Sequence, residues 1–380
     1  PEGPTLAWIL LNSHCGPPFD LFLKTSFRPL LAYDSMSSME RPGVTQASEL
    51  QKFRELMQKL PKTDMHLHIE GSISLSEYAE VNEIKAGWEP PGWGLDYRYP
   101  NFTVFEEFIL GYADQWFNSP ERYARSAKSL FERKIAEGVR YLECSFAFIV
   151  CEQQELPVDE IVDAIISVVP NGLHVRLFCG LHHTSWSTKT RPALERLIEL
   201  NALTGIDLHG PELYPVREWM LDYWPAAQDR GKFTKAHAGE LGGAWHVTEA
   251  VEKLGVRRIE HGFRAIEDDA VVDLLRAENV LLDVCPISNY KLQTVNSYQD
   301  HPMIQLLERG ISMTINTDDP FIFGNTITDE FDVLARETAL SKKTLLQLAR
   351  NGFEYAILSD EERCVLLAEF DETVEGVALS

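Results

Sequence analysis

The chain lacks an excess of positive charge and a long apolar run, and each absence excludes a class of protein. Its 380 residues hold 35 Lys and Arg against 58 Asp and Glu, which gives a formal net charge of −23 at pH 7. Such a surface repels phosphates and anionic lipid, so we expect neither a nucleic-acid partner nor a membrane partner. The apolar run at residues 6–11 is too short to span a bilayer, and it lacks the positively charged lead-in of a secretory signal.

Cysteine is also scarce, with six residues and no Cys-x-x-Cys pair. We therefore expect reduced, mostly buried thiols and a cytoplasmic protein. The acidic balance favours a neutral or cationic small molecule as the partner.

The chain divides at about residue 46. Residues 1–46 contain scattered Pro, Gly and Ser, and we expect them to be a poorly organised N-terminal extension; an alternative is that part of this segment lies upstream of the native start. We expect residues 47–380 to form a single domain, since α/β barrels often exceed 250 residues as one domain, although length alone also allows two.

Short apolar runs alternate with amphipathic stretches over most of the chain. The runs expected to form strands are residues 62–68, 139–146, 174–182, 204–210, 233–239, 258–262, 280–286 and 312–318. Between them, apolar residues recur at helical spacing, as at Val247, Ala250, Val251 and Leu254. Helices are also expected at residues 47–60 and 341–358. Eight alternations of strand and helix predict the α/β class and a (β/α)8 barrel of the TIM type.

The segment at residues 71–138 is longer than one crossover needs, and it is rich in aromatic residues such as Trp88, Trp93 and Phe105. It predicts extra helices inserted after the first strand. These helices would cover the barrel mouth as a lid, or they would form an additional packing layer.

Histidines and aspartates recur at the carboxyl ends of the predicted strands, where barrel enzymes place their catalytic groups. They are His66 and His68 on the first strand, Asp207 on the fourth, His237 on the fifth, His261 on the sixth and Asp318 on the eighth. Packing alone gives no reason for this shared placement, so the pattern predicts an active site at that mouth.

Four of these residues form a plausible metal site. His66 and His68 are two apart on a strand, so their side chains face the same way. His237 adds a third imidazole and Asp318 a carboxylate, a set that suits Zn²⁺ with one position left for water. Other divalent metals remain possible. Each histidine taken alone could equally be a hydrogen-bonded core residue.

Three further residues supply acid and base groups. Glu240 follows His237 by three, and burial there would let its carboxylic acid donate a proton, although it could also cap a helix beginning near Gly242. His261 could orient or deprotonate a metal-bound water, or it could bond a backbone carbonyl. Asp319 adjoins Asp318, and two neighbouring carboxylates are costly unless a cation or a ligand offsets them. The alternative for Asp319 is a solvated turn before Pro320.

In their order along the chain, these motifs resemble the adenosine deaminase family. The matching segments are PKTDMHLHIEGS (61–72), GIDLHGPE (205–212), AHAGE (236–240), IEHGFR (259–264), CPISNYKL (285–292) and INTDDP (315–320). The resemblance covers about residues 47–370. It implies one Zn²⁺ per chain, held by His66, His68, His237 and Asp318.

The resemblance also implies a role for each residue that faces the substrate. Glu240 would protonate the purine N1, while His261 and Asp318 would position and deprotonate the attacking water. Asp319 would share a proton with N7, the backbone of Gly210 would donate to N3, and His68 and Glu70 would border the bound purine. The implied reaction is hydrolytic deamination at C6, which needs no organic cofactor, and the expected conversion is adenosine to inosine plus ammonia.

One position departs from the adenosine-specific pattern. Residue 70 is Glu, where adenosine-specific members usually carry Asp to meet the sugar. Glu70 and the segment at residues 285–292 are more similar to adenine deaminases and aminodeoxyfutalosine deaminases, which are therefore the alternative. The segment at residues 205–212 is similar to the adenosine branch, although His209 and Pro211 are unusual in it.

Other classes fit less well. A second zinc deaminase fold uses His-x-Glu and Pro-Cys-x-x-Cys, and the chain lacks the second motif. A general metal-dependent amidohydrolase with a carbamylated lysine would have to use Lys235, and amide hydrolysis leaves Glu240 without a ring nitrogen to protonate. A non-catalytic purine-binding protein would be expected to lack a ligand or Glu240, and all are present.

Overall fold

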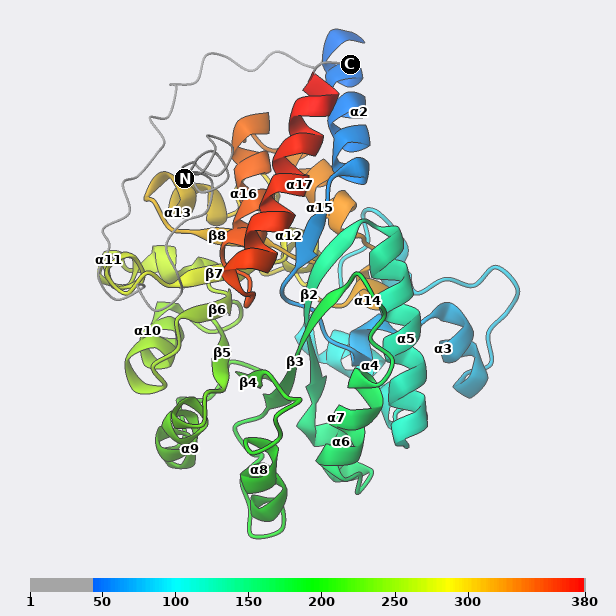
Figure 1. The fold of residues 1–380 in the computed structure, drawn as a ribbon, viewed down its shortest axis with the longest axis vertical. Coiled ribbons are helices and arrows are strands. Elements are labelled where there is room, and N and C mark those ends of the chain that lie inside the picture. The colour runs from blue at the N-terminus through cyan, green and yellow to red at the C-terminus, as the bar shows by residue number, and fades with distance from the viewer. Residues whose placement is uncertain (1–43, 379–380) are drawn as a thin grey trace, which may run out of the picture.

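The computed structural model describes residues 44–378 of the protein, and Figure 1 shows its fold. Eight parallel strands form one sheet in the order β1 to β8, and helices lie between them. The strands are β1 (Lys62–Asp64), β2 (Val139–Ala147), β3 (His174–Leu181), β4 (Gly205–Leu208), β5 (Phe233–Ala238), β6 (Arg258–His261), β7 (Leu281–Val284) and β8 (Met313–Ile315). This order confirms the predicted α/β class and the (β/α)8 barrel.

The barrel closes between β8 and β1 without a regular ladder. A single bridge joins Leu67 and Asp318, where the N–H of His68 donates to the Asp318 carbonyl at 3.1 Å. Nearer the strand starts, side chains replace backbone acceptors: the N–H of Met65 donates to Asn316 Oδ1 at 2.7 Å, and that of Thr317 donates to Asp64 Oδ1 at 3.1 Å. The two strands are therefore shorter than the predicted runs at residues 62–68 and 312–318.

Helices surround the sheet. Those before β5 are α2 (Val44–Lys59), α3 (Leu75–Val81), α4 (Phe102–Trp116), α5 (Pro120–Ala136), α6 (Phe148–Gln153), α7 (Val158–Ile166), α8 (Arg191–Leu197) and α9 (Glu218–Asp229). The later ones are α10 (Ala244–Lys253), α11 (Asp269–Ala277), α12 (Pro286–Lys291), α13 (Met303–Glu308), α14 (Pro320–Phe323), α15 (Ile327–Glu337), α16 (Lys342–Glu354) and α17 (Asp360–Ala378). The expected terminal helix at residues 341–358 is α16, and α17 follows it and packs beside α2 (Figure 1).

The insertion after β1 contains α3 and α4, followed by α5, which returns the chain to β2. Asn101 caps α4 by accepting a hydrogen bond from the N–H of Val104. One face of this helix lines the cavity at the barrel mouth through Phe105, Ile109 and Ala113, among others. The expectation that inserted helices cover the mouth is therefore confirmed for α4.

The structure bears on two expectations from composition, the state of the cysteines and the lack of a membrane-spanning segment. Cys144, Cys151, Cys179 and Cys285 are free and buried, as expected, but Cys364 is disulfide-bonded, which corrects the expectation of a reduced thiol at that residue. Cys364 lies on α17 and is half-buried, whereas the other four cysteines are buried. Within residues 44–378, no helix is both long enough and apolar enough to cross a membrane.

The predicted poorly organised extension covers residues 1–46, of which residues 1–43 lie outside the described residues, while residues 44–46 are helical and correct the prediction there. Helix α2 begins at Val44, three residues before the start expected for the domain.

Candidate active site

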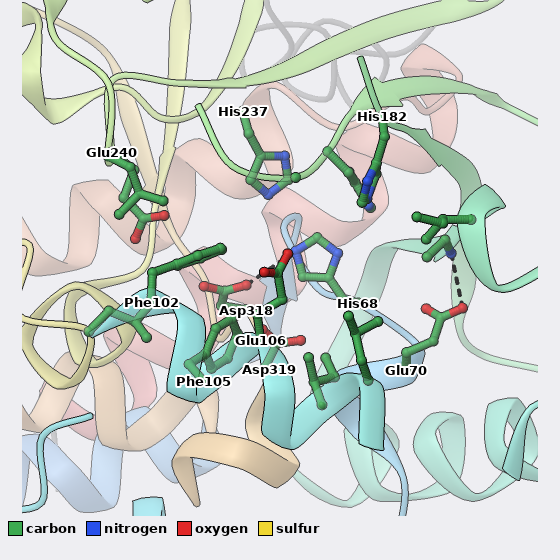
Figure 2. A pocket seen from close by; sticks show the side chains of 18 of the residues that line it. His68, Glu70, Phe102, Phe105, Glu106, His182, His237, Glu240, Asp318 and Asp319 are labelled. Atoms are coloured by element: carbon green, nitrogen blue, oxygen red, sulfur yellow. Dashed lines mark hydrogen bonds and ion pairs between the residues drawn. The ribbon is translucent and has the colours of Figure 1, made fainter. Parts of the chain in front are cut away.

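Three imidazoles converge at the mouth of the barrel, on the side of the strand carboxyl ends. Ligand atoms of His66, His68 and His237 lie within 4.8 Å of one another. The Nε2 atoms of His66 and His237 are 3.2 Å apart, and Asp318 Oδ1 lies 3.2 Å from His68 Nε2 and 3.6 Å from His66 Nε2. The structure thus brings together the four residues predicted as metal ligands, and Figure 2 shows three of them side by side.

The opposite nitrogen of each imidazole contacts the protein. His66 Nδ1 is 3.2 Å from the Asp283 carbonyl oxygen, His68 Nδ1 is 3.0 Å from Ser145 Oγ, and His237 Nδ1 is 3.0 Å from the Leu208 carbonyl oxygen. Such contacts fix the orientation of a metal-ligating histidine and leave Nε2 free to bind. Three nitrogen donors and a carboxylate, oriented in this way, fit Zn²⁺.

Asp318 is held in an unusual backbone conformation. Its φ is 62°, in the left-handed region that L-residues other than Asn, Asp and His seldom adopt. Ser288 Oγ donates to Asp318 Oδ2 at 2.6 Å, which leaves Oδ1 directed at the histidines. His261 is similar, with φ at 65°. Strained residues at the ends of two strands are a common feature of functional sites.

Glu240 lies on a loop held by a second glutamate. The Glu212 carboxylate accepts hydrogen bonds from the N–H groups of Gly239, Glu240 and Gly242, each at 2.8 to 3.1 Å. Asn289 Nδ2 donates to Glu240 Oε1 at 2.9 Å. Burial raises the pKa of Glu240 well above its ordinary value, and the negative charge of Asp318 raises it further. This shift favours the protonated form of the side chain, which can donate a proton.

His261 lies between the acid and the metal ligands. Its Nε2 is 3.5 Å from Glu240 Oε2 and 4.0 Å from Asp318 Oδ2, and its Nδ1 is 3.1 Å from Asn289 Nδ2. Burial lowers the pKa of His261 well below its ordinary value, and the neighbouring His66 lowers it further. A neutral imidazole in this place can accept a proton.

Asp319 lines the cavity, and one of its two carboxylate oxygens is buried against Gly71 without a partner in the described structure. Its side chain is buried, and Oδ1 finds no hydrogen-bond partner among the residues that the structure describes. A Cβ on Gly71 would lie 1.6 Å from this oxygen, so glycine is needed there for the close approach. A buried polar atom without a partner is costly, and a ligand donor would relieve that cost.

Glu70 lines the same cavity from the other side (Figure 2). Its Oε1 accepts hydrogen bonds from Tyr123 Oη and from the N–H of Ala147, both at 2.9 Å. Gly210, the predicted backbone donor, also lines the cavity, with φ at 87°.

The cavity joins these residues into one site. It has an empty volume of about 890 Å³, counting its open mouth. Its walls combine the acidic and histidine residues above with apolar side chains from α4 and with Ile149, Val150, Leu241 and Leu292. None of the described residues that line it is Lys or Arg. The site can hold a flat polar ring against apolar walls, but it offers no cationic side chain to a phosphate.

Sequence reasoning missed the residues that support this site. Ser145, Glu212, Ser288 and Asn289 each hold a predicted residue in place. Three of them fall inside the matched segments at residues 205–212 and 285–292, which was the only signal available. Asp207, predicted at the mouth, lies behind His237, with Oδ2 3.4 Å from Nδ1.

Lys235 is not available for a carbamylated metal bridge. Its Nζ lies 2.7 Å from Glu260 Oε1 and 3.3 Å from Glu143 Oε2, and it donates to the Met65 carbonyl at 2.9 Å. The ammonium group is thus engaged below the site, which counts against the amidohydrolase alternative that required it.

Comparisons with known proteins agree with the site. The family model described as adenosine deaminase matches residues 61–373. An adenine deaminase of Streptomyces coelicolor is 32% identical over 83% of this chain and 96% of its own length. An adenosine deaminase of Klebsiella pneumoniae is 31% identical over 81% of this chain and 97% of its own. The crystal structure of an adenine deaminase from Arthrobacter aurescens superposes with a TM-score of 0.73, at 27% identity, over 83% of this chain and 99% of that one.

The chain therefore belongs to the adenosine deaminase family. Members of this family are hydrolases that act on the C–N bond of a cyclic amidine, and the activity supported for this chain is hydrolytic deamination of a 6-aminopurine.

Proposed function

We propose that this chain deaminates adenosine with one Zn²⁺ held by His66, His68, His237 and Asp318. The observation that carries the proposal is the convergence of three Nε2 atoms and one carboxylate oxygen opposite Glu240 in a single cavity. Nitrogen and oxygen donors of this kind suit zinc. When bound, the ion supplies Lewis-acid activation of water near neutral pH.

The protein's own residues supply the remaining steps. Glu240, whose protonated form is favoured by burial, donates to N1 of the purine as the ring loses its aromaticity. His261, neutral because it is buried, together with Asp318, orients the attacking water and takes its proton. Asp319, which lines the cavity, shares a proton with N7. The backbone of Gly210 donates to N3, and His68 borders the ring beside Asp319.

The cavity supports a nucleoside or a base over a nucleotide. Its walls are mostly apolar and carry a few convergent polar groups, as is usual for sites that bind small molecules. Its lining includes Glu70, Glu106 and Asp319 but no Lys or Arg, so a phosphate would meet negative charge without a compensating cation.

One observation favours the free base adenine as a second candidate substrate. Glu70 is nearly fully buried, and Tyr123 and Ala147 hold its carboxylate by hydrogen bonds. A longer acid fixed at this position takes up space that a shorter one would leave for the sugar on N9.

Ammonia release by the zinc-loaded protein, with adenosine and adenine offered in parallel, tests the proposal. Faster turnover of adenosine supports the lead substrate. Faster turnover of adenine reassigns the branch and makes Glu70 the residue that closes the N9 side. A zinc-loaded protein that releases ammonia from neither would contradict both candidates.

Two broader statements belong to the same proposal. We propose a single deaminase domain over residues 47–380, since all the described site residues lie on one sheet and its loops. A cytoplasmic location is supported by the four free, buried cysteines, whereas the disulfide at Cys364 counts against it.

A further inference from the structure

His209 is a buried histidine at the carboxyl end of β4 that the roles above do not use. Its Nε2 lies 2.9 Å from Asp207 Oδ2 and 3.2 Å from Ser145 Oγ. One ring nitrogen is therefore shared between a carboxylate on its own strand and a hydroxyl on β2.

Each of these two partners contacts a different predicted metal ligand. Ser145 Oγ is 3.0 Å from His68 Nδ1, and Asp207 Oδ2 is 3.4 Å from His237 Nδ1. The contacts form an unbroken path from His68 through Ser145, His209 and Asp207 to His237. The His209 ring also meets both ligand rings edge to face, at centroid distances of 4.6 Å from His68 and 4.9 Å from His237.

The neighbouring strand makes room for the His209 ring. Gly180 on β3 pairs in register with Asp207, two residues before His209. A Cβ on Gly180 would lie 1.9 Å from His209 Nδ1 and 2.1 Å from its Cε1, far inside van der Waals contact. Its φ is not in the left-handed region, so the demand for glycine here comes from space and not from backbone conformation. The His209 ring can therefore occupy this position only because residue 180 has no side chain.

We propose that His209, in the space left by Gly180, is a positioning residue. Through its contacts with Ser145 and Asp207, it fixes the positions of the His68 and His237 rings relative to each other. The ligands come from β5 and from the segment after β1, so a shared support on β4 fixes their Nε2 atoms relative to each other. Partners of this kind raise metal affinity because they fix ring orientation before the metal arrives. The inference rests on the zinc site of the proposed function.

A different interpretation of the same residues is a second cation site, because ligand atoms of Asp207, His209, His237 and Glu260 lie within 4.8 Å of one another. The hydrogen-bonding geometry favours the support role. His237 Nδ1 is 2.8 Å from Glu260 Oε2 and 3.0 Å from the Leu208 carbonyl, so these atoms already contact one another at hydrogen-bond distance.

The test measures zinc affinity by chelator competition for the full chain and five variants, with circular dichroism of the metal-free forms as a check on folding. His209→Ala is expected to raise the dissociation constant for zinc about 10- to 100-fold. His209→Gln is expected to recover part of this loss, since an amide can both donate to Asp207 and contact Ser145. His182→Ala is the matched control: it removes another imidazole that lines the cavity, and it should leave zinc affinity unchanged.

Gly180→Ala supplies an independent arm, because it leaves every polar group in place. It should weaken zinc binding by displacing the His209 ring, and Gly180→Ala combined with His209→Ala should bind zinc no more weakly than His209→Ala alone. The inference is overturned if folded His209→Ala keeps native zinc affinity, if the two losses multiply in the double variant, or if the native chain binds two zinc ions. A native chain that binds no zinc would overturn the proposed function as well, whereas native binding with an unaffected His209→Ala would overturn the positioning role alone.

Discussion

The interior of the barrel and its mouth both contain buried carboxylates, but they differ in whether Lys or Arg pairs with these groups. Below the site, three buried carboxylates face a cation: Arg258 lies 2.8 Å from Glu143 and 2.5 Å from Asp283, and Lys235 lies 2.7 Å from Glu260. At the mouth, Glu70, Glu240 and Asp319 are buried, and the described structure shows no Lys or Arg paired with any of them.

The ion pairs in the interior affect the stability of the fold, whereas the unpaired acids at the mouth affect its chemistry. A buried ion pair whose partners are both present is close to neutral in stability, whereas a buried acid without a cation is costly and keeps an altered proton affinity. The interior layer therefore supports the site, while the mouth keeps its acids available for a metal ion and a purine. Substitutions in the interior should lower the stability of the protein, whereas substitutions at the mouth should lower its activity.

The largest effect is expected at the mouth, from Glu240→Gln. The amide keeps the shape of the side chain but cannot donate a proton to N1, so kcat should fall by about 10² to 10⁴ while zinc content is unchanged. Steady-state ammonia release measures this loss. Glu267→Gln, which changes an exposed glutamate nearby, is the matched control and should retain native turnover. Near-native kcat in Glu240→Gln would remove this residue from its assigned role.

The next effect is expected in the interior layer, from Arg258→Met. Loss of the guanidinium leaves Glu143 and Asp283 buried with one cation fewer, so the free energy of unfolding should fall by about 3–5 kcal/mol. Urea unfolding measures it, and turnover per folded molecule should change far less than in Glu240→Gln. The exposed Arg276→Met should change stability by less than about 0.5 kcal/mol. Equal stability of the two variants would mean that the interior pairs do not support the barrel.

A smaller effect is expected from Glu70→Asp, which shortens the acid on the proposed N9 side by one methylene. The ratio of kcat/KM for adenosine to that for adenine should rise about 10-fold or more, because one methylene in a fitted pocket discriminates by that order. Parallel progress curves on the two substrates give the ratio. An unchanged ratio would mean that Glu70 does not read the N9 side.

The smallest effect is expected from the apolar wall on α4. Ile109→Ala should raise KM about 3- to 10-fold with little change in kcat, since it removes contact area but no reacting group. Val104→Ala, on the exposed side of the same helix, is the control and should leave KM unchanged. A fall in kcat with unchanged KM would give α4 a part in the chemistry instead.

Much of the fold and the centre of the site could be predicted from the sequence. The alternation of apolar runs predicts the strands, and the placement of His66, His237 and Asp318 at strand ends predicts where they meet. The ends of β1 and β8 could not be predicted, because Asn316 and Asp64 replace backbone partners there, and no periodicity signals that exchange.

The supporting residues were missed for a related reason. Ser145 is 77 residues from His68, and Glu212 is 28 residues from Glu240, so each contact exists only once two neighbouring strands have paired. His209 was visible as an unusual residue in its segment, but its connection to both metal ligands requires the register of β3 and β4.

A metal titration tests the central claim most directly. Metal-free protein would be titrated with Zn²⁺ while ammonia release from adenosine and from adenine is followed at each step. The account predicts that activity on the preferred substrate rises with added zinc and saturates at one ion per chain. Full activity without metal, or a requirement for two ions, would contradict it.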